Sequence, residues 1–386
     1  MPEQPGVPIR SLLIIPSKIL PNTSTLTAND LRPQADFYAL QTRLNADILD
    51  MSALEGNSLP LLVSLLLRFS NCGSLALLAY ARRKDYDIMF SNAENIGIPL
   101  ALLFRLSDRS PVHAMIGHRL SAGKKRLLLR AARSRIHCVF VYSELQRKVA
   151  ADLLQLNANR LLLIPFHADQ RFFRPLSAGN SGPQGMPTIC SAGLEWRDYA
   201  TLLRAVDGLH VNVCIGAHSP WSRQSSGIEG GGVTLPPNVC VKQYGYAELR
   251  TLYSESAIVV VPLKQNDFQA GITVILEAMA MGRPVITTQT DGMAPGLINE
   301  ENCLLTPAGD ANALRSAISR LLENPSEAKR MGDRGRETLL NTPGMTLDGW
   351  ATRIAETMTA LVKPDTYLPK TAAAGNDSAS AERKSS

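Results

Sequence analysis

The feature that most constrains the fold is a regular alternation of short apolar runs with helix-like patterns along almost the whole chain. In the first half, the runs that suit β-strands cover residues 11–19, 46–51, 86–91, 112–117, 137–142 and 161–165. In the second half, they cover residues 188–192, 211–216, 239–244, 257–263, 284–290 and 303–306. Helical patterns fill most of the gaps, as parallel strands joined by crossover helices require. The pattern predicts an α/β protein with two Rossmann-like halves, each built on a parallel sheet.

The length of 386 residues allows two domains, each with its own hydrophobic core. A Pro/Gly/Ser-rich segment, 175–187, is the best candidate for the linker between them. We therefore expect an N-terminal domain over 1–175, a C-terminal domain over 176–345 and a helix over 346–363. Residues 364–386 are small and polar, which predicts a disordered tail.

Composition indicates an ordinary soluble protein, with 45% apolar and 19% charged residues. The uncharged apolar run 58–67 is too short to span a bilayer, and the N-terminus lacks a signal-peptide pattern. The six cysteines have no paired spacing, so we expect reduced thiols, no disulfides and no zinc. These features favour a cytoplasmic protein.

The net charge of +6 is unevenly distributed. Between Asp108 and Glu144 there are eight basic residues and no acidic one, and residues 122–135 have the pattern of a basic amphipathic helix. Such a helix suits peripheral contact with an anionic membrane, here at the inner membrane face, or with an anionic acceptor. The alternative is the solvated outer face of a domain helix. We expect no nucleic-acid partner.

Glu277 is a lone carboxylate in an apolar helical run, and it needs a partner because burying an unpaired carboxylate is costly. Gly271 stands where this helix should begin, and its backbone can approach a ligand closely. A helix N-terminus binds anions, and Thr273 precedes Glu277 by about 6 Å at a rise of 1.5 Å per residue. The segment suits a nucleoside diphosphate, with its phosphates at Gly271, Ile272 and Thr273 and its ribose at Glu277. Since ligands of open parallel sheets bind beyond the carboxyl ends of the strands, the site should face the cleft between the domains.

Three stretches carry a resemblance to a known family. Residues 275–286 (ILEAMAMGRPVI), followed by 304–310 (LLTPAGD) and the helical pattern 313–322, resemble glycosyltransferase family 4. These are retaining, group 1 nucleotide-sugar glycosyltransferases. The resemblance implies a GT-B fold, in which two Rossmann-like domains face each other across a cleft. It also implies transfer of a sugar from a nucleotide-diphosphate sugar to a carbohydrate, lipid or small-molecule acceptor, with retention of configuration and without a metal or other cofactor.

The family resemblance assigns the site residues, with one departure in the acidic pair. Members carry two glutamates eight residues apart, and the second, which bonds the ribose, corresponds to Glu277. The first position is Gln269 here, which can hydrogen-bond the transferred sugar but carries no charge. His118, at the end of the strand 112–117, matches a family histidine that faces the same sugar, although a lone histidine is often structural.

A second departure concerns the donor diphosphate. The family has an arginine after the glycine that corresponds to Gly193, and here that position is Leu194. Arg197 corresponds to the family lysine and can bridge a diphosphate bidentately. The alternative is that Arg197 pairs with Glu195 or Asp198 on the surface. The two departures motivate a second hypothesis, a catalytically weakened or non-catalytic GT-B scaffold or partner subunit.

Overall fold

The computed structural model describes residues 9–55, 60–121, 123–176, 185–217 and 235–362. All twelve predicted strands are present in these residues. The first six are β1 (Ser11–Ile14), β2 (Asp47–Leu49), β3 (Ile88–Ser91), β4 (Val112–Gly117), β5 (Cys138–Val141) and β6 (Leu161–Leu163). The other six are β7 (Thr188–Ala192), β8 (Asn212–Gly216), β9 (Val239–Val241), β10 (Ile258–Val261), β11 (Val285–Thr288) and β12 (Leu304–Thr306). β1 ends five residues earlier than predicted, shortly before Pro16, which has no N–H to donate to a sheet.

The strands form two six-stranded sheets, one in each half of the chain, with orders β2-β1-β3-β4-β5-β6 and β12-β11-β10-β7-β8-β9. Every pair of neighbouring strands is parallel. The predicted pair of Rossmann-like domains is therefore confirmed.

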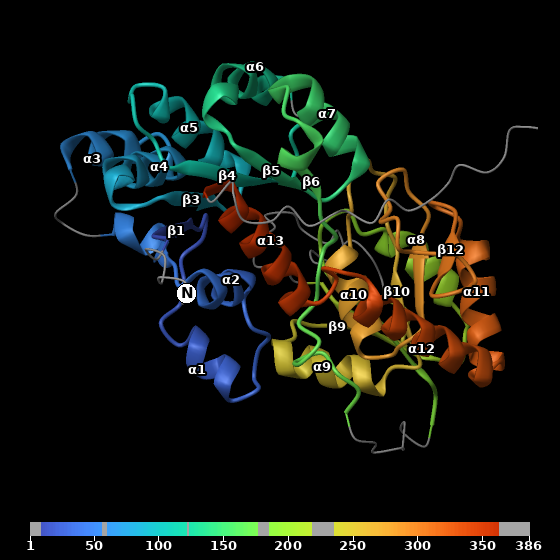
Figure 1. Cartoon of the computed structure of the whole chain (residues 1–386). Helices are drawn as coiled ribbons and strands as arrows, with labels where there is room; N and C mark the ends of the chain where they lie inside the picture. The colour runs from blue at the N-terminus through green and yellow to red at the C-terminus, as the bar shows by residue number, and fades with distance from the viewer. Residues whose placement is uncertain (1–8, 56–59, 122, 177–184, 218–234, 363–386) are drawn as a thin grey trace, which may run out of the picture.

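Helices cover both faces of the N-terminal sheet. Leu13 and Phe90 face one layer, whereas Leu12 and Met89 face the other, as the two-residue period of a strand requires. The first layer contains α2 (Asp36–Leu44) and α13 (Leu347–Val362). The second contains α3 (Leu61–Leu67), α4 (Asn71–Ala81), α5 (Glu94–Phe104), α6 (Gly123–Ala132) and α7 (Glu144–Leu154). A short helix, α1 (Thr23–Ala28), lies beside this domain (Figure 1).

The C-terminal sheet is covered in the same way. One face packs against α9 (Tyr246–Glu255) and α10 (Ile272–Ala280), and the other against α8 (Tyr199–Val206) and α11 (Ala311–Glu323). Helix α12 (Pro325–Asn341) packs on both α10 and α11. Since both faces are covered, the strands are predominantly apolar on both sides, which is why they appear in the sequence as nearly continuous apolar runs.

The last described helix returns to the N-terminal domain. α13 matches the helix predicted over 346–363, and its Trp350 and Ile354 belong to the core formed with α2 and β1. The chain therefore crosses between the domains twice, and the two crossings are hydrogen-bonded to each other. Ala168 donates to Met345, and Leu347 donates to Ala168, both at 3.0 Å. The predicted tail (364–386) and most of the predicted linker (177–184) lie outside the described residues.

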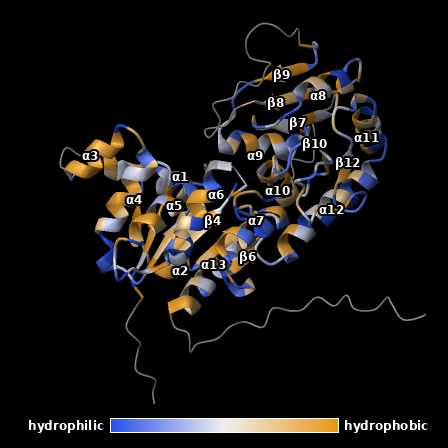
Figure 2. Cartoon of the chain, turned by 90° about the horizontal axis from the view of Figure 1, so that it is seen from above, coloured by the Kyte–Doolittle hydropathy of each residue, from blue (hydrophilic) through white to orange (hydrophobic). Residues whose placement is uncertain are grey.

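The domains also touch away from these crossings. The guanidinium of Arg250, on α9, lies 2.9 Å from the carboxylate of Asp30, which follows α1. Within the described part of the chain, no helix is both long and apolar enough to cross a membrane. Figure 2 shows that hydrophobic residues nevertheless colour α3, at the outer edge of the N-terminal domain.

Candidate functional site

Helix α10 follows the loop after β10, and a glycine, Gly271, stands at the N-terminus of the helix. Gly271 caps the helix with φ +74°, a conformation that favours glycine. A Cβ at this position would lie 2.7 Å from Val261 Cγ1 and 3.2 Å from Arg197 Nη1. The helix ends before Gly282, which has φ +67°. Both predicted ends of the helix are confirmed, and only glycine lets the loop come this close to Arg197.

A pocket of about 290 Å³ opens beyond the carboxyl ends of β7, β8 and β10. Its lining includes five of the predicted site residues, namely Gly193, Arg197, Gly271, Thr273 and Glu277. Tyr244, Tyr246 and Leu249 complete one side. These residues all belong to the C-terminal domain, and they come from four separate stretches of the chain. The volume is at the lower end of the range for small-molecule sites.

Glu277 has the partner that its burial demands. The side chain is only 7% exposed, and its Oε2 accepts a 2.9 Å hydrogen bond from the hydroxyl of Tyr253. Burial raises the pKa of Glu277 to about 7, while the hydrogen bond from Tyr253 and the charge of Arg197 act in the opposite direction. The carboxylate therefore lines the pocket and does not point into packed aliphatic side chains.

Tyr253 is a residue that the sequence analysis missed. It lies on α9, 24 residues before Glu277, and burial together with the neighbouring carboxylate raises its pKa well above the usual value. The cost of an unpaired carboxylate predicted that some partner exists, but several tyrosines and arginines could have filled that role. No spacing in the sequence distinguishes Tyr253 from them.

Arg197 is buried in the wall of the pocket, and backbone carbonyls hold its guanidinium. Its Nε donates to the carbonyl of Ala192 at 2.8 Å, and its Nη1 donates to the backbone carbonyl of Glu195 at 2.9 Å. No carboxylate of the described chain lies within ion-pair distance of this guanidinium. Asp198 instead caps α8 through Thr201. The alternative of a surface pair with Glu195 or Asp198 is wrong, and the buried cation lines the pocket, where the charge of Glu277 acts on it from beyond ion-pair distance.

The backbone around Arg197 is shaped to hold this side chain. Gly193 has φ +94°, and a Cβ there would overlap Arg197 Nη2. Trp196 also adopts a left-handed conformation, with φ +57°, which is uncommon for a bulky residue. Strained backbone of this kind occurs preferentially at functional sites.

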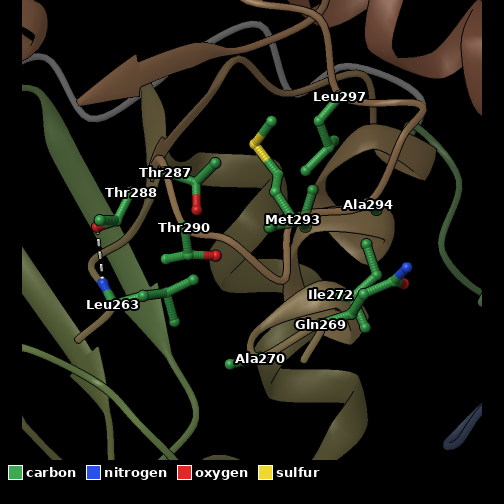
Figure 3. A pocket seen from close by; sticks show the side chains of 11 residues that line it. Leu263, Gln269, Ala270, Ile272, Thr287, Thr288, Thr290, Met293, Ala294 and Leu297 are labelled. Atoms are coloured by element: carbon green, nitrogen blue, oxygen red, sulfur yellow. Dashed lines mark hydrogen bonds between the residues drawn. The ribbon is translucent and has the colours of Figure 1, made fainter. Parts of the chain in front are cut away.

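Gln269 and Ile272 do not line this pocket, so the predicted contact of Ile272 with the diphosphate is not seen there, whereas the predicted contact of Gln269 with the transferred sugar stays a prediction. Both line a separate cavity of about 10 Å³, large enough for about one water molecule (Figure 3). The backbone N–H of Ile272 donates to the carbonyl of Gln269 at 3.4 Å, so it is already used within the loop. The Gln269 amide donates at 2.6 Å to the carbonyl of Tyr142, in the N-terminal domain. Gln269 thus forms an interdomain contact here.

His118 is exposed at the end of β4 and does not line the pocket. Its ring stacks on that of Tyr142, with centroids 5.4 Å apart, and Nε2 lies 3.3 Å from the carbonyl of Asn92. Its backbone N–H donates at 3.0 Å to Glu94, a buried carboxylate paired with Lys125 at 2.6 Å. Tyr142 therefore contacts both His118, through its ring, and Gln269, through its carbonyl.

Residues 193–324 match the family model described as "Glycosyl transferases group 1". The chain contains a glycosyl transferase group 1 domain. The match begins at Gly193 and includes every residue of the pocket lining except Ala192.

Two proteins similar in sequence to this chain have names that agree with a glycosyl transferase domain. The chain is 22% identical to MMP alpha-(1->4)-mannosyltransferase of Mycolicibacterium hassiacum over 66% of each protein. It is 37% identical to the lipopolysaccharide core biosynthesis glycosyltransferase LpsE of Rhizobium meliloti, over 17% of this chain and 20% of that protein. The chain thus spans just under two thirds of the length of the first and a fifth of the second.

Several solved structures have a similar fold over nearly the whole chain. Sucrose-phosphate synthase from Thermosynechococcus elongatus has a TM-score of 0.67 at 20% identity, covering 92% of this chain and all of that one. HepE from Anabaena, in complex with UDP-glucose, has a TM-score of 0.63 at 15% identity, with coverages of 91% and 99%. The fold is therefore GT-B, as expected. In the part of the chain that the structure describes, no group of three His, Cys, Asp or Glu residues could hold a metal ion.

Proposed function

We propose that this protein is a glycosyltransferase that binds a nucleotide-diphosphate sugar in the pocket of the C-terminal domain. The observation that carries the proposal is the convergence of the Glu277 carboxylate, the buried Arg197 cation and the start of α10 on one pocket. The group 1 domain supports it, because the mannosyltransferase and LpsE matched by this chain are both named glycosyltransferases. The acceptor would be a carbohydrate, a lipid or a small molecule.

In this proposal the donor lies along the first turns of α10. The ribose hydroxyls would donate to the carboxylate of Glu277, which already accepts from Tyr253 through one oxygen. The diphosphate would lie at Gly271 and Thr273, where the helix N-terminus presents backbone N–H groups. Tyr244 and Tyr246 line the same pocket and provide aromatic surface for a base.

The reaction requires stabilisation of the charge on the departing nucleoside diphosphate. Arg197 and the α10 N-terminus supply fixed positive charge there, in a partly water-excluded position. The guanidinium needs no reorganisation, because Ala192 and Glu195 already hold it. We further propose retention of anomeric configuration by front-face displacement, with the sugar held between the pocket and the side of the N-terminal domain that carries His118.

The test has two stages. Thermal unfolding is first measured with common nucleoside diphosphates and nucleotide sugars, and a donor at 100 times its dissociation constant should stabilise the fold by about 2.7 kcal/mol. Glu277→Ala should abolish that shift. The best donor is then used for transfer assays, and NMR of the product reports the anomeric configuration.

If millimolar nucleotide sugars leave the unfolding temperature of the wild-type protein unchanged, the proposal is wrong and a non-catalytic scaffold becomes the better account. If donors bind but the product has inverted configuration, only the assignment of retention is wrong.

A further inference from the structure

Helix α3 exposes most of its apolar surface. Of its seven residues only Val63 is buried. Leu61, Leu62 and Leu65 are 75%, 68% and 46% exposed, and Phe69, just beyond the end of the helix, is 86% exposed. An apolar cluster of this kind on a short surface helix calls for a covering partner. In Figure 2 it lies at the edge of the N-terminal domain farthest from the C-terminal domain.

A second exposed apolar site occurs on the same helical layer. Helices α3, α4, α5 and α6 pack one against the next across one face of the N-terminal sheet. On α6, Leu129 is buried against the core, whereas Leu127 and Leu128 are 72% and 47% exposed. Arg126 and Arg130 are exposed beside them, four residues apart and so on one side of the helix. The basic helix predicted over 122–135 is present as α6 over Gly123–Ala132, with a 3-10 turn over Arg133–Arg135 after it, and α6 carries leucines on its outer surface.

The charge of this layer is strongly positive. Residues 60–143 contain thirteen Lys or Arg and four Asp or Glu, an excess of nine, whereas the whole chain has an excess of only six. One of the four acids, Glu94, is buried and bonded to Lys125. The other three are Asp85, Asp87 and Asp108, so no acidic side chain lies on α3 or α6.

We propose that this helical layer is a docking surface for an anionic lipid bilayer. The side chains of Leu61, Leu62, Leu65 and Phe69 would enter the boundary between headgroups and acyl chains, while Arg126 and Arg130 would lie among anionic headgroups. Apolar side chains combined with cations bind such a surface through both buried area and electrostatic attraction.

The distribution of the exposed residues favours a bilayer over a protein partner. A protein interface typically has one compact apolar centre with a polar rim. Here exposed apolar residues occur on α3 and just after it, at Leu106 after α5, and on α6, and cations occur between and beside them. A fluid bilayer can contact these separate apolar and cationic sites at the same time. The inference does not depend on the proposed donor reaction, because the layer and the pocket share no residue.

The experiment is sedimentation of the full chain with vesicles of phosphatidylcholine, with and without about 30% phosphatidylglycerol. The wild-type protein should partition at least about tenfold better onto the anionic vesicles, and about 0.5 M salt should remove most of this preference. Arg126→Gln with Arg130→Gln should weaken partitioning about 25-fold, at about fivefold for each cation. Leu61→Ser, Leu62→Ser and Phe69→Ser combined should weaken it by about tenfold or more.

Two matched variants in the C-terminal domain serve as controls. Ile298→Ser with Leu340→Ser removes exposed apolar side chains, and Lys329→Gln with Arg330→Gln removes the same amount of charge. Both should bind within about twofold of wild type. Leu61→Trp keeps an apolar side chain at this position and adds a fluorescent readout. The emission of the introduced indole should shift to shorter wavelength when the protein binds anionic vesicles.

Several outcomes would overturn the inference. The wild-type protein could fail to prefer anionic vesicles, or the triple serine variant of α3 could bind as wild type while the emission of the Leu61→Trp variant stays unchanged. If light scattering showed a dimer that the triple serine variant dissociates, a second copy of the chain, and not a membrane, would cover the face.

Discussion

The hydroxyl of Tyr253 donates a 2.9 Å hydrogen bond to Oε2 of Glu277, which joins α9 to α10 beneath the ligand pocket. Both side chains are buried. Burial raises the pKa of the carboxyl to about 7, so the group that is proposed to bind ribose changes its charge near neutral pH. Stability and ligand affinity should both depend on this ionisation.

Glu277→Gln should alter how stability depends on pH. The pKa of the folded state, about 7, lies above the ordinary value of 4.5, so the folded state holds the proton more tightly than the unfolded chain. The stabilisation is complete below about pH 4.5 and is lost as the pH rises through about 7. The wild-type protein should therefore lose on the order of 3 kcal/mol relative to Glu277→Gln between about pH 4.5 and 8. Urea unfolding at four pH values tests this, and parallel profiles for the two proteins would contradict it.

Tyr253→Phe should weaken donor binding most at neutral pH. Without the Tyr253 hydroxyl, Glu277 loses a hydrogen bond that favours its ionised form. The pKa of Glu277 should therefore rise further, and a larger fraction of the carboxyl should be protonated at pH 7. We expect a loss of about 1–3 kcal/mol in unfolding free energy at pH 8. Calorimetric titration with nucleoside diphosphates at pH 7 and 8.5 measures the effect on binding. Tyr86→Phe is the control, because that hydroxyl bonds the exposed carboxylate of Asp47 at 2.8 Å; its effect should be small.

Arg197→Gln should discriminate between ligands by their phosphates. If the buried guanidinium contacts the diphosphate, affinity for a nucleoside diphosphate should fall by about 10–100-fold, consistent with loss of about 1.5–3 kcal/mol for a charged hydrogen bond. Affinity for the corresponding monophosphate should change much less. Arg204→Gln, on the exposed side of α8, should leave both affinities unchanged. Equal losses for the two nucleotides would argue that Arg197 only supports the fold.

Gly271→Ala should be more destabilising than Gly309→Ala. Both glycines have nearly the same left-handed backbone, with φ +74° and +76°, so both substitutions incur about 1–2 kcal/mol of backbone strain. At Gly309 the new methyl group would have no neighbour within 4 Å, whereas at Gly271 it would meet Val261 at 2.7 Å. The additional cost should be about 1–3 kcal/mol, as in other overpacked sites. Urea unfolding of both variants measures it, and equal losses would show that the loop can move away.

Gln269→Glu should not improve catalysis, although it restores the glutamate of the resembled family. In this structure the Gln269 amide donates to the carbonyl of Tyr142, and an ionised carboxylate cannot donate. The variant should lose this interdomain bond, and small-angle X-ray scattering should show a larger radius of gyration. Gln269→Ala, which removes the bond without adding charge, should show a smaller change. A higher turnover in Gln269→Glu would establish a catalytic role for the position.

The sequence was sufficient to locate the strands and five of the residues that line the pocket. Strands covered on both faces are predominantly apolar, so all twelve could be located from apolar runs that alternate with helical patterns. Gly271 and Glu277 were predictable because their chemistry depends on nearby residues, a helix start and a carboxylate two turns or less along it, whereas Arg197 was assigned through the family resemblance. Relations between residues that are close in the chain can be recognised from the sequence.

The hydrogen-bond partners of Glu277 and Gln269 became known only from the tertiary structure. Tyr253 lies 24 residues from Glu277 in the chain, and Tyr142 lies 127 residues from Gln269, yet each pair is in hydrogen-bond contact. The same packing placed Ile272 beside a small cavity, left Leu61 and Leu62 in solvent and returned α13 to the first domain. Periodicity tells which side of a helix is apolar, but what covers that side depends on how distant helices pack around both sheets at once.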